Sequence, residues 1–585
     1  MAITMLVGND VSDAETALLD DVVVRGSVDF NGLPANKAKS GCWEIRFFHH
    51  RCVVLIPCVE VAERFAYYGI SSNLISYLTG PLGQSTATAA EKRQCLEWSG
   101  DASAAFRRFR RRLLFGSISY HYHCLSALRL ETLRSRDLGS SSMSAALHSY
   151  NSSHCKNDAN NLACSPPPFE VIVFFFSLYL VAFAQGGHKP CVQAFGADQF
   201  DEEDPEECKA KSSFFNWWYF SMNGGILVAF SVLSYIQENL SWELGFGIPC
   251  IAMCLALILF LLGSMTYRFR INSDQRNPFV RIGWVFMKAA RNWHAAPTVI
   301  SIEEEAQQIL PYEGFLDKAL LTPDGSEDSG NVCSIGDVHD AKAILRLVPI
   351  WCSCLGYAVV FSQTSTLFTK QGATMDRHVI SGFQIPAASL QALICLSIVL
   401  FIRIYDRVLV PIARAITKKP AGISMLQRIG AGIVLSFLAM VIAALTERQR
   451  LETAVKYGLV NKPKATIPMS VWWLAPQYLL FGIADAFTMV GLQEFFYDQV
   501  PSELKSIGLA LYLSIFGIGS FLSGFLISVI KKASSGDGHD SWFSNNLNRA
   551  HLDYFYWLLA AVSAATIAAY AYFANHYVYN TKSKV

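Results

Sequence analysis

The stretch Pro57-Cys-Val-Glu-Val-Ala-Glu-Arg-Phe-Ala-Tyr-Tyr-Gly69 places Glu60, Glu63 and Arg64 inside an apolar run that extends from about residue 53 to 78. An α-helix has 3.6 residues per turn, so these three charged side chains share one helical face. A charge at the centre of a bilayer costs roughly 2.5–3.5 kcal/mol on insertion scales, and such groups normally face a bundle interior or a watery cavity. The stretch predicts a membrane helix with a functional charged face; the alternative is a soluble amphipathic helix whose charges are solvated.

The composition of the whole chain favours the membrane interpretation. Its 585 residues are 52% hydrophobic and 16% charged, and the mean hydropathy of +0.29 is too apolar for an ordinary soluble protein of this length. The net charge of +1 gives no electrostatic reason to expect a nucleic-acid partner. None of the fifteen cysteines forms a CxxC pair, so we predict neither a metal site nor a disulfide framework, although Cys155 and Cys164 could pair if their polar loop faces an oxidising compartment.

Segments of about 20 apolar residues recur along the chain, each long enough to cross a hydrocarbon core of about 30 Å. Ten are clear, at residues 53–78, 171–190, 214–236, 245–265, 343–363, 381–403, 424–446, 471–492, 505–530 and 553–575. Glycine and proline interrupt several of them, and membrane helices tolerate both because they permit close packing and kinks. The sequence therefore predicts an all-α polytopic membrane protein.

Polar segments divide these helices into two groups. We predict a cytosolic tail at 1–50, a first bundle at 51–266, a cytosolic linker with an amphipathic helix at 267–342, a six-helix bundle at 343–577 and a cytosolic tail at 578–585. Six Lys or Arg against one acid between residues 268 and 291 mark the linker as cytosolic by the positive-inside rule. No cleavable signal peptide is visible at the start of the chain. One loop disagrees with this topology, because residues 447–468 carry five Lys or Arg and would lie outside.

One segment of the first bundle lacks the expected membrane helices. From residue 92 to 144 the chain shows no convincing span and carries ten Lys or Arg against four acids. Its centre, Phe106-Arg-Arg-Phe-Arg-Arg-Arg-Leu113, resembles a basic patch for RNA or anionic lipid. No soluble fold adjoins this patch, so we do not expect nucleic-acid binding. Two further helices between residues 80 and 150 would bring the total to twelve and place the sequons at Asn151 and Asn239 outside.

Several motifs resemble those of the plant nitrate/peptide transporter family, part of the proton-dependent oligopeptide transporters in the major facilitator superfamily. Residues 60–69 match the ExxER or ExxEK motif of that family's first helix. Residues 185–201, 211–220, 361–377 and 490–501 look like further family signatures in the expected order. The resemblance covers about 55–91 and 145–580 and implies a major facilitator fold of two six-helix bundles, with the second and third helices of the first bundle disrupted.

The departures from the family pattern suggest an altered reading frame. The family carries an Asp-x-Phe-x-Gly-Arg-Tyr loop between its second and third helices, which is replaced here. The stretch Ser117-Ile-Ser-Tyr-His-Tyr-His-Cys-Leu-Ser126 looks like a Gly-Arg-Tyr-Arg-Thr-Ile-Ile-Val stretch whose codons are read one nucleotide out of frame. Residues 44–58 similarly suggest a shifted entry to the first helix. We hypothesise a compensated frameshift or mis-predicted splice, with the frame regained near Ser142.

The resemblance implies uptake of a small-molecule substrate driven by a proton gradient, with no other cofactor. The proton-coupling residues would be Glu60, Glu63, Arg64 and Lys189, which matches the family's fourth-helix lysine. Loss of water favours the protonated form of a carboxylate and a nearby cation favours the ionised form, so such a group can change protonation as the cavity opens to either side. The alternative for Lys189 is a side chain that snorkels from a helix end.

Candidate substrate-binding residues lie in both halves. Asp485 stands mid-span where family members often have Glu, and would pair with a substrate amine or close a gate. Its shorter side chain puts direct contact with a peptide amino group in doubt. Phe361 occupies the place where a nitrate-carrying member has histidine, which weakens nitrate as the substrate because an anion loses a protonatable donor there. Aromatic residues at helical spacing also serve packing, and that alternative applies to the remaining cavity candidates, which are Tyr67, Tyr68, Trp351 and Gln363.

Two functions from different classes follow. The first is a proton-coupled symporter of di- or tripeptides or other plant metabolites, in the plasma or vacuolar membrane. The second is a transport-inactive product of a frame-shifted gene, because a half that lacks two helices cannot readily enclose a cavity; low-affinity nitrate transport is a further alternative. An enzyme is not expected, since no phosphate-binding glycine loop, HExxH or suitably placed GxSxG is present.

Overall fold

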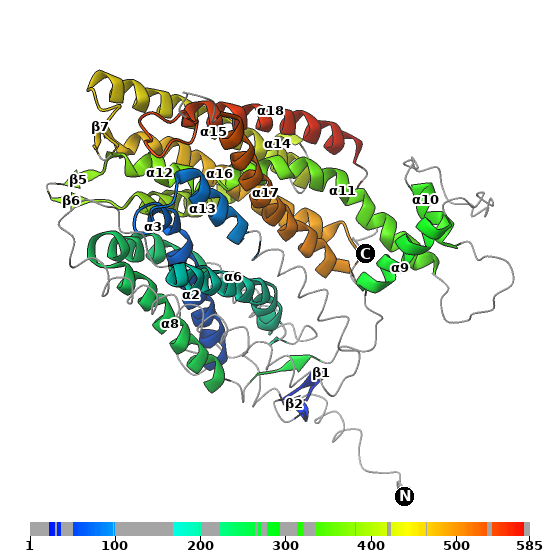
Figure 1. Cartoon of the computed structure of the whole chain (residues 1–585). Coiled ribbons are helices and arrows are strands. Elements are labelled where there is room, and N and C mark those ends of the chain that lie inside the picture. Colours follow the sequence, from blue (N-terminus) through cyan, green and yellow to red (C-terminus); the bar gives the residue numbers. More distant parts are fainter. Residues whose placement is uncertain are drawn as a thin grey trace, which may run out of the picture.

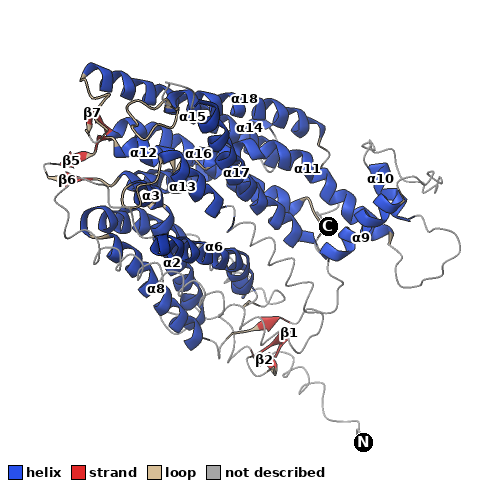
Figure 2. Ribbon diagram, viewed as in Figure 1, coloured by secondary structure: helices blue, strands red, loops and turns tan. Residues whose placement is uncertain are grey.

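The computed structural model shows a helical protein built from two groups of long helices (Figures 1 and 2). It describes residues 23–29, 32–36, 51–97, 99, 168–197, 199–200, 207, 221–263, 267–270, 278–292, 313–320, 334–380, 382–417, 423–463, 465–501, 504–534, 541–577 and 579. The sequon at Asn151 and the cysteines Cys155 and Cys164 lie outside these ranges, as does most of the segment from 92 to 144.

The first half contains the helix that carries the charged face. Its elements are α2 (Arg51–Ser71), α3 (Leu74–Thr79), a helix over residues 86–97, α6 (Pro168–Ala197), a helix from residue 221 that passes through the π-helical turns η2 (Ala229–Leu233) and η3 (Ile236–Leu240), and α8 (Trp242–Leu262). The predicted first span is thus broken at residues 72–73, where α3 begins after Asn73. At the start of α8, the Ser241 hydroxyl accepts from the Leu244 amide at 3.2 Å and caps the helix.

The second half contains most of the long helices, including α15, which has 32 residues. Its elements are α11 (Ile335–Phe361), α12 (Leu367–Ala373), η6 (Ala387–Gln391), α13 (Ala392–Ile404), η7 (Tyr405–Leu409), α14 (Val410–Thr417), α15 (Met425–Lys456), η8 (Val471–Leu474), α16 (Ala475–Asp498), α17 (Lys505–Ser534) and α18 (Leu552–His576). Capping boxes fix two starts, with Ser334 and Asp337 at α11 and Ser424 and Gln427 at α15. The first cap places the start of α11 inside the range predicted as linker, because the first turns of this helix are polar.

Seven helices among the described residues are long and apolar enough to cross a membrane, namely α8, α11, the segment Ala387–Leu409, α15, the segment Val471–Asp498, α17 and α18. The chain is therefore a multi-pass membrane protein, as predicted. α15 continues ten residues beyond the predicted end of its span, so much of the basic 447–468 loop is helical. Residues 92–97 are helical too, continuous with 86–91, although the sequence shows no convincing span there.

Short strands occupy the two ends of the bundle. β1 (Val23–Val28) pairs antiparallel with β2 (Pro34–Asn36) and with β3 (Phe269–Arg270), in the order β2-β1-β3. At the other end, β4 (Met375–Asp376) pairs with β7 (Ile467–Ser470), and β5 (His378–Ile380) pairs with β6 (Phe383–Gln384). Figure 1 shows β5, β6 and β7 beside α3 and α12; we call this the closed end, because the two halves meet there.

The linker forms a small helical layer at the opposite end, which we call the linker end. It contains α9 (Pro278–Arg291), α10 (Glu313–Asp317) and the turn η5 (Lys318–Leu320), and these pack beside the start of α11 (Figure 1). The predicted amphipathic helix of the linker is therefore present as α9.

Candidate functional site

The charged face of α2 forms a compact buried cluster. The Arg64 Nε atom lies 2.7 Å from Glu60 Oε1 and 3.3 Å from Glu63 Oε2. Both carboxylates are buried, and Glu60 and Arg64 stand one helical turn apart, as the sequence spacing predicts. The structure therefore brings together three of the four residues proposed for proton coupling.

Such a cluster is costly to bury and costly to break. Two acids share one guanidinium, so removing Arg64 would leave two buried carboxylates without its compensation, and such a loss costs roughly 3–5 kcal/mol in proteins. Protonation of one carboxylate changes the charge of the cluster without that loss of structure. The arrangement can therefore hold or release a proton while the helix stays folded.

The fourth residue, Lys189, lies within α6. Its side chain is outside the described part of the structure, and its pairing with the α2 carboxylates stays a prediction.

Tyr68 lies where the two halves meet. Its ring makes edge contacts with Tyr67 at a centroid distance of 5.2 Å and with Phe230 at 5.5 Å. It also packs against the hydrophobic cluster formed by Ile226, Phe230 and Cys395, the last of which belongs to α13 in the second half. Tyr67 and Tyr68 thus combine the packing role with a position next to the charged face.

Asp485 occupies a comparable place in the second half. The Tyr357 hydroxyl of α11 donates to Asp485 Oδ1 at 3.0 Å, and the Tyr357 ring stacks on Phe481 at 6.1 Å. Phe361 contacts Phe481 and Phe516 in the same aromatic group. Among the described residues, no Lys or Arg forms an ion pair with Asp485, so a cation that entered this site would meet an uncompensated carboxyl group beside aromatic rings.

Two predicted cavity residues tie α11 to α17. The Trp351 indole donates to Ser514 Oγ at 2.9 Å and to the Leu511 carbonyl at 3.1 Å. The Gln363 amide is fully buried and donates to Ser523 Oγ at 2.7 Å. Both side chains therefore position helices, and the structure gives Gln363 no exposed surface toward a cavity.

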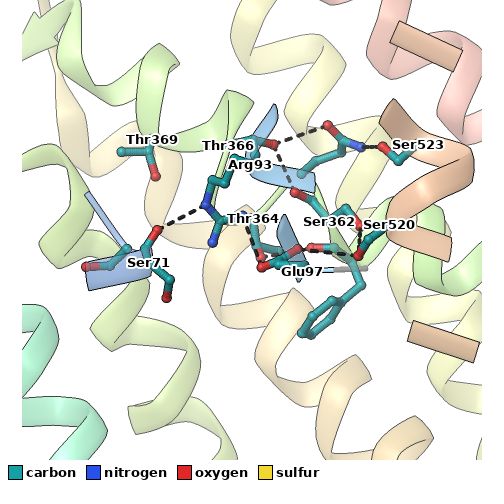
Figure 3. A network of polar contacts seen from close by, with 12 residues as sticks. Ser71, Arg93, Glu97, Ser362, Thr364, Thr366, Thr369, Ser520 and Ser523 are labelled. Carbon is teal, nitrogen blue, oxygen red and sulfur yellow. Dashed lines mark hydrogen bonds and ion pairs between the residues drawn. The ribbon is translucent and has the colours of Figure 1, made fainter. Parts of the chain in front are cut away.

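A polar network missed by the sequence reasoning joins the helix over residues 86–97 to α11 and α17 (Figure 3). Arg93 Nε donates to the Ser71 carbonyl at 3.0 Å, and Arg93 Nη1 lies 3.1 Å from Glu97 Oε1. The Ser520 hydroxyl donates to Glu97 Oε2 at 3.4 Å and lies 3.1 Å from Ser362 Oγ. Arg93 and Glu97 belong to the segment that departs from the family pattern, which is why motif matching could not find them.

Further contacts between the halves gather at the closed end. Lys370 Nζ donates to Thr79 Oγ1 at 2.7 Å, and Arg377 Nη1 pairs with Glu238 Oε2 at 2.7 Å. Gln391 Nε2 donates to the Ser72 carbonyl at 3.2 Å. Burial lowers the pKa of Lys370 to about 8, and the Glu238 carboxylate partly opposes this shift.

The charged groups of the two halves lie at similar depth below the closed end. Glu63 precedes the end of α2 by eight residues, and Asp485 follows the start of α16 by ten. At 1.5 Å per residue these spacings correspond to about 12 and about 15 Å. Acids from both halves thus lie at similar distances beneath the polar contacts of the closed end.

Comparison with known proteins identifies the family. The family model described as PTR2, POT family, matches residues 139–543. Protein NRT1/PTR FAMILY 5.10 of Arabidopsis thaliana is 57% identical over 582 residues, covering 98% of this chain and 99% of that protein. Protein NRT1/PTR FAMILY 5.14 of the same plant is 50% identical, covering 97% and 99%. This chain belongs to the POT family.

Solved structures confirm the fold of this POT family member. The crystal structure of an auto-inhibited POT family peptide transporter has a TM-score of 0.67 at 19% identity and covers 90% of this chain and 98% of that chain. A POT family transporter in complex with 5-aminolevulinic acid has a TM-score of 0.59 at 15% identity, covering 93% and 99%. The predicted all-α fold is therefore confirmed. The family match and the plant relatives confirm the predicted family, so the chain is a membrane transporter.

The family match also bears on the unusual segment of this POT protein. It begins at residue 139, near the end of the range 92–144 that lacks the family pattern. The motif at residues 60–69 lies outside that match, yet the two plant relatives align over nearly the whole chain. The departure is therefore local.

Proposed function

We propose that this POT family member is a proton-coupled symporter of small organic solutes, such as di- or tripeptides or other plant metabolites, which works by alternating access. One observation carries the proposal: acids stand at similar depth in both halves, the buried Glu60 and Glu63 with Arg64 in α2 and the partly buried Asp485 in α16. Acids in the membrane interior are expensive and mark proton or substrate pathways.

Glu63 is the proton carrier in this proposal. Arg64 lies closer to Glu60 than to Glu63, so Arg64 stabilises the ionised form of Glu60 more than that of Glu63. Lys189 of α6 would compete with Arg64 for these carboxylates. A proton on Glu63 would free a cation, and the two helices could then move relative to one another.

Asp485 is the substrate-side acid. Tyr357 orients its carboxyl group with a hydrogen bond, and the neighbouring aromatic rings exclude water from one side. A substrate ammonium group would be attracted both to the carboxylate and to the ring faces. The site would therefore favour solutes with a cationic group. Tyr67, Tyr68 and Trp351 would complete the walls of the cavity.

The direction of access follows from the charge of the linker. Its basic residues favour a cytosolic linker end with both chain termini on that side, in the plasma or vacuolar membrane. The halves are joined at the closed end by Arg377–Glu238 and Lys370–Thr79, which would then face away from the cytosol. The structure would represent the state that is open toward the cytosol.

Uptake measurements test the proposal. Proteoliposomes that contain the purified protein receive an inward proton gradient, and radiolabelled dipeptides, nitrate and plant hormones are offered in turn. We expect gradient-driven accumulation of at least one organic solute, and we expect Glu63→Gln to abolish the accumulation while leaving gradient-independent exchange. Undiminished gradient-driven accumulation by Glu63→Gln would refute the role of Glu63. Accumulation by the unaltered protein that a proton ionophore does not reduce would refute proton coupling.

The alternative function is a transport-inactive product of a frame-shifted gene, which the start of the family match at residue 139 favours. A matched variant in which residues 92–144 are replaced by the aligned residues of Protein NRT1/PTR FAMILY 5.10 separates the two functions. If only the replaced protein transports, the chain as written is the transport-inactive product. Sequencing of the mature transcript settles the cause, since an intact frame encoding Ser117–Ser126 as written would exclude a frame error.

A further inference from the structure

Helix α9 has two different faces. Its inner face is formed by Ile282, Val285 and Ala289, which are buried in the main hydrophobic core. On the opposite face, Trp284 is 42% exposed and Met287 is 58% exposed. Arg291 follows one turn later and is exposed as well. The spacing of three and four residues places these three side chains in one stripe.

The mounting of α9 on α11 fixes its depth in the membrane. Arg281 Nη2 lies 2.9 Å from Asp340 Oδ2, and Arg281 Nε lies 3.4 Å from Asp337 Oδ1. The apolar part of α11 begins at Ala343, three residues beyond Asp340, which is about 4.5 Å along the helix axis. It contains one charge, Arg346, which lies near its start, where a long side chain can snorkel to the headgroups. The headgroup layer on each side of a bilayer is roughly 5–7 Å thick. This end of α9 therefore lies at headgroup depth.

The other end of α9 is also held. Asn292 Nδ2 donates to the Lys318 carbonyl of η5 at 2.9 Å, and Lys342 of α11 pairs with Asp317 of α10 at 2.7 Å. The helix is therefore a fixed part of the second half, and its orientation does not depend on lipid. Its exposed stripe points away from α11, since the inner face packs there.

The chemistry of the stripe matches one surface. Tryptophan is enriched at the membrane–water interface, and apolar side chains flanked by Lys or Arg bind the boundary between headgroups and acyl chains. Helix α9 carries Arg281, Lys288 and Arg291 and no acid. Arg281 pairs with Asp337 and Asp340 of α11, so the positive charge excess near the stripe comes from Lys288 and Arg291. Such a charge excess attracts anionic lipid, whereas zwitterionic lipid offers no net charge to it.

We propose that the stripe of Trp284, Met287 and Arg291 on α9 is a binding site for the headgroups of anionic phospholipids in the leaflet at the linker end. Trp284 and Met287 enter the boundary region, and Arg291 contacts the phosphate groups, with Lys288 on the same side of the helix. The site goes beyond the transport function and does not depend on it.

Quenching of tryptophan fluorescence by brominated lipid tests the site. The full-length protein is reconstituted in phosphatidylcholine vesicles that contain either dibrominated phosphatidylglycerol or dibrominated phosphatidylcholine at the same mole fraction. The signal of Trp284 is taken as the difference between the unaltered protein and Trp284→Phe. We expect about a fivefold preference of the site for the anionic lipid at low ionic strength for each basic side chain involved, and loss of most of it in 0.5 M salt.

Charge variants give the specific control. Arg291→Gln should remove most of the preference, whereas Arg448→Gln should leave it intact, because Arg448 is 70% exposed on α15 far from α9. Equal quenching by the two brominated lipids in the unaltered protein would overturn the proposal, and so would an unchanged preference in Arg291→Gln. The salt dependence is measured on the unaltered protein and Trp284→Phe alone, so a poorly folded charge variant does not prevent a decision. Neither readout involves transport, so failure here leaves the proposed symport untouched.

Discussion

The ion pair between Arg377 and Glu238 at the closed end should control how often the two halves separate. Arg377→Gln removes the contact at 2.7 Å between η3 of the first half and the segment after α12 of the second. The two side chains retain 24% and 17% exposure, so solvent screens the pair and we assign it about 1 kcal/mol. That value corresponds to about a fivefold change in the ratio of separated to joined halves.

Distances between spin labels at the exposed positions Leu240 and Val379 report this ratio. The labels are carried by genetically encoded amino acids, because the chain has fifteen cysteines. We expect Arg377→Gln to raise the separated population about fivefold. Glu238→Gln should have at least that effect, since Glu238 also acts on Lys370.

A double-mutant cycle decides whether the pair acts as a unit. The variant with both substitutions should shift the distances no further than Glu238→Gln alone, because the interaction is lost once. Arg549→Gln is the matched control: Arg549 is exposed and bonds to Asn461 of the same half at 2.6 Å, so it should leave the distances unchanged. Unaltered distance distributions in both single variants, or a double variant equal to their sum, would refute the reasoning.

Three further predictions concern stability. Glu447→Gln leaves the fully buried Arg450 without its carboxylate partner at 2.6 Å and should lower the free energy of unfolding by roughly 3–5 kcal/mol. The measurement is the thermal unfolding midpoint in detergent. The control Glu452→Gln, in the exposed pair with Arg448, should change this midpoint little. Gly508→Ala directs a methyl group into the Phe496 carbonyl of α16 and should lower the stability by roughly 1–3 kcal/mol in the same assay. The control is Gly224→Ala, whose methyl group meets no atom within 4 Å and which should be neutral or stabilising. Equal unfolding midpoints for the two variants would be inconsistent with close packing of α16 on α17. The pKa of Lys370 is lowered to about 8, so the unfolded chain binds more protons than the folded chain between pH 8 and the ordinary lysine pKa of about 10.4. The unfolding midpoint of the unaltered protein should therefore rise with pH in that window relative to the midpoint of Lys370→Met. Parallel pH profiles of the two proteins would contradict the assigned burial of Lys370.

The charged face of α2 was predictable because it depends only on local geometry. Helical spacing alone places Glu60 and Arg64 on one face, and the structure finds them 2.7 Å apart. Seven of the ten predicted spans recur among the described residues as helices long and apolar enough to cross a membrane, since length and apolarity are local properties. Asp485 could be placed mid-span by the same reasoning, but its bond to Tyr357 depends on how α11 packs against α16.

Contacts between distant segments could not be predicted from the sequence. Arg377 belongs to a recognised signature, yet nothing in that motif indicates Glu238 as its partner. Gln363 was predicted to line a cavity because it is a polar side chain in a span. In the structure it instead packs against α17, where it donates to Ser523 Oγ. Arg450 lies in a stretch that reads as a basic external loop, and only the folded structure reveals that it binds Glu447 and the Leu547 carbonyl.

The small sheet β2-β1-β3 joins the two ends of the first half. β1 precedes α2 and β3 follows α8, so their pairing fastens the entry and the exit of the whole helix group side by side. A rotation of the first half would then carry the N-terminal tail and the beginning of the linker together. Deletion of the residues before Val23 leaves the pairing of β1 with β3 intact. Deletion through Val28 removes that pairing, so the start of the linker is no longer held against the first half and the connection between the two halves becomes longer.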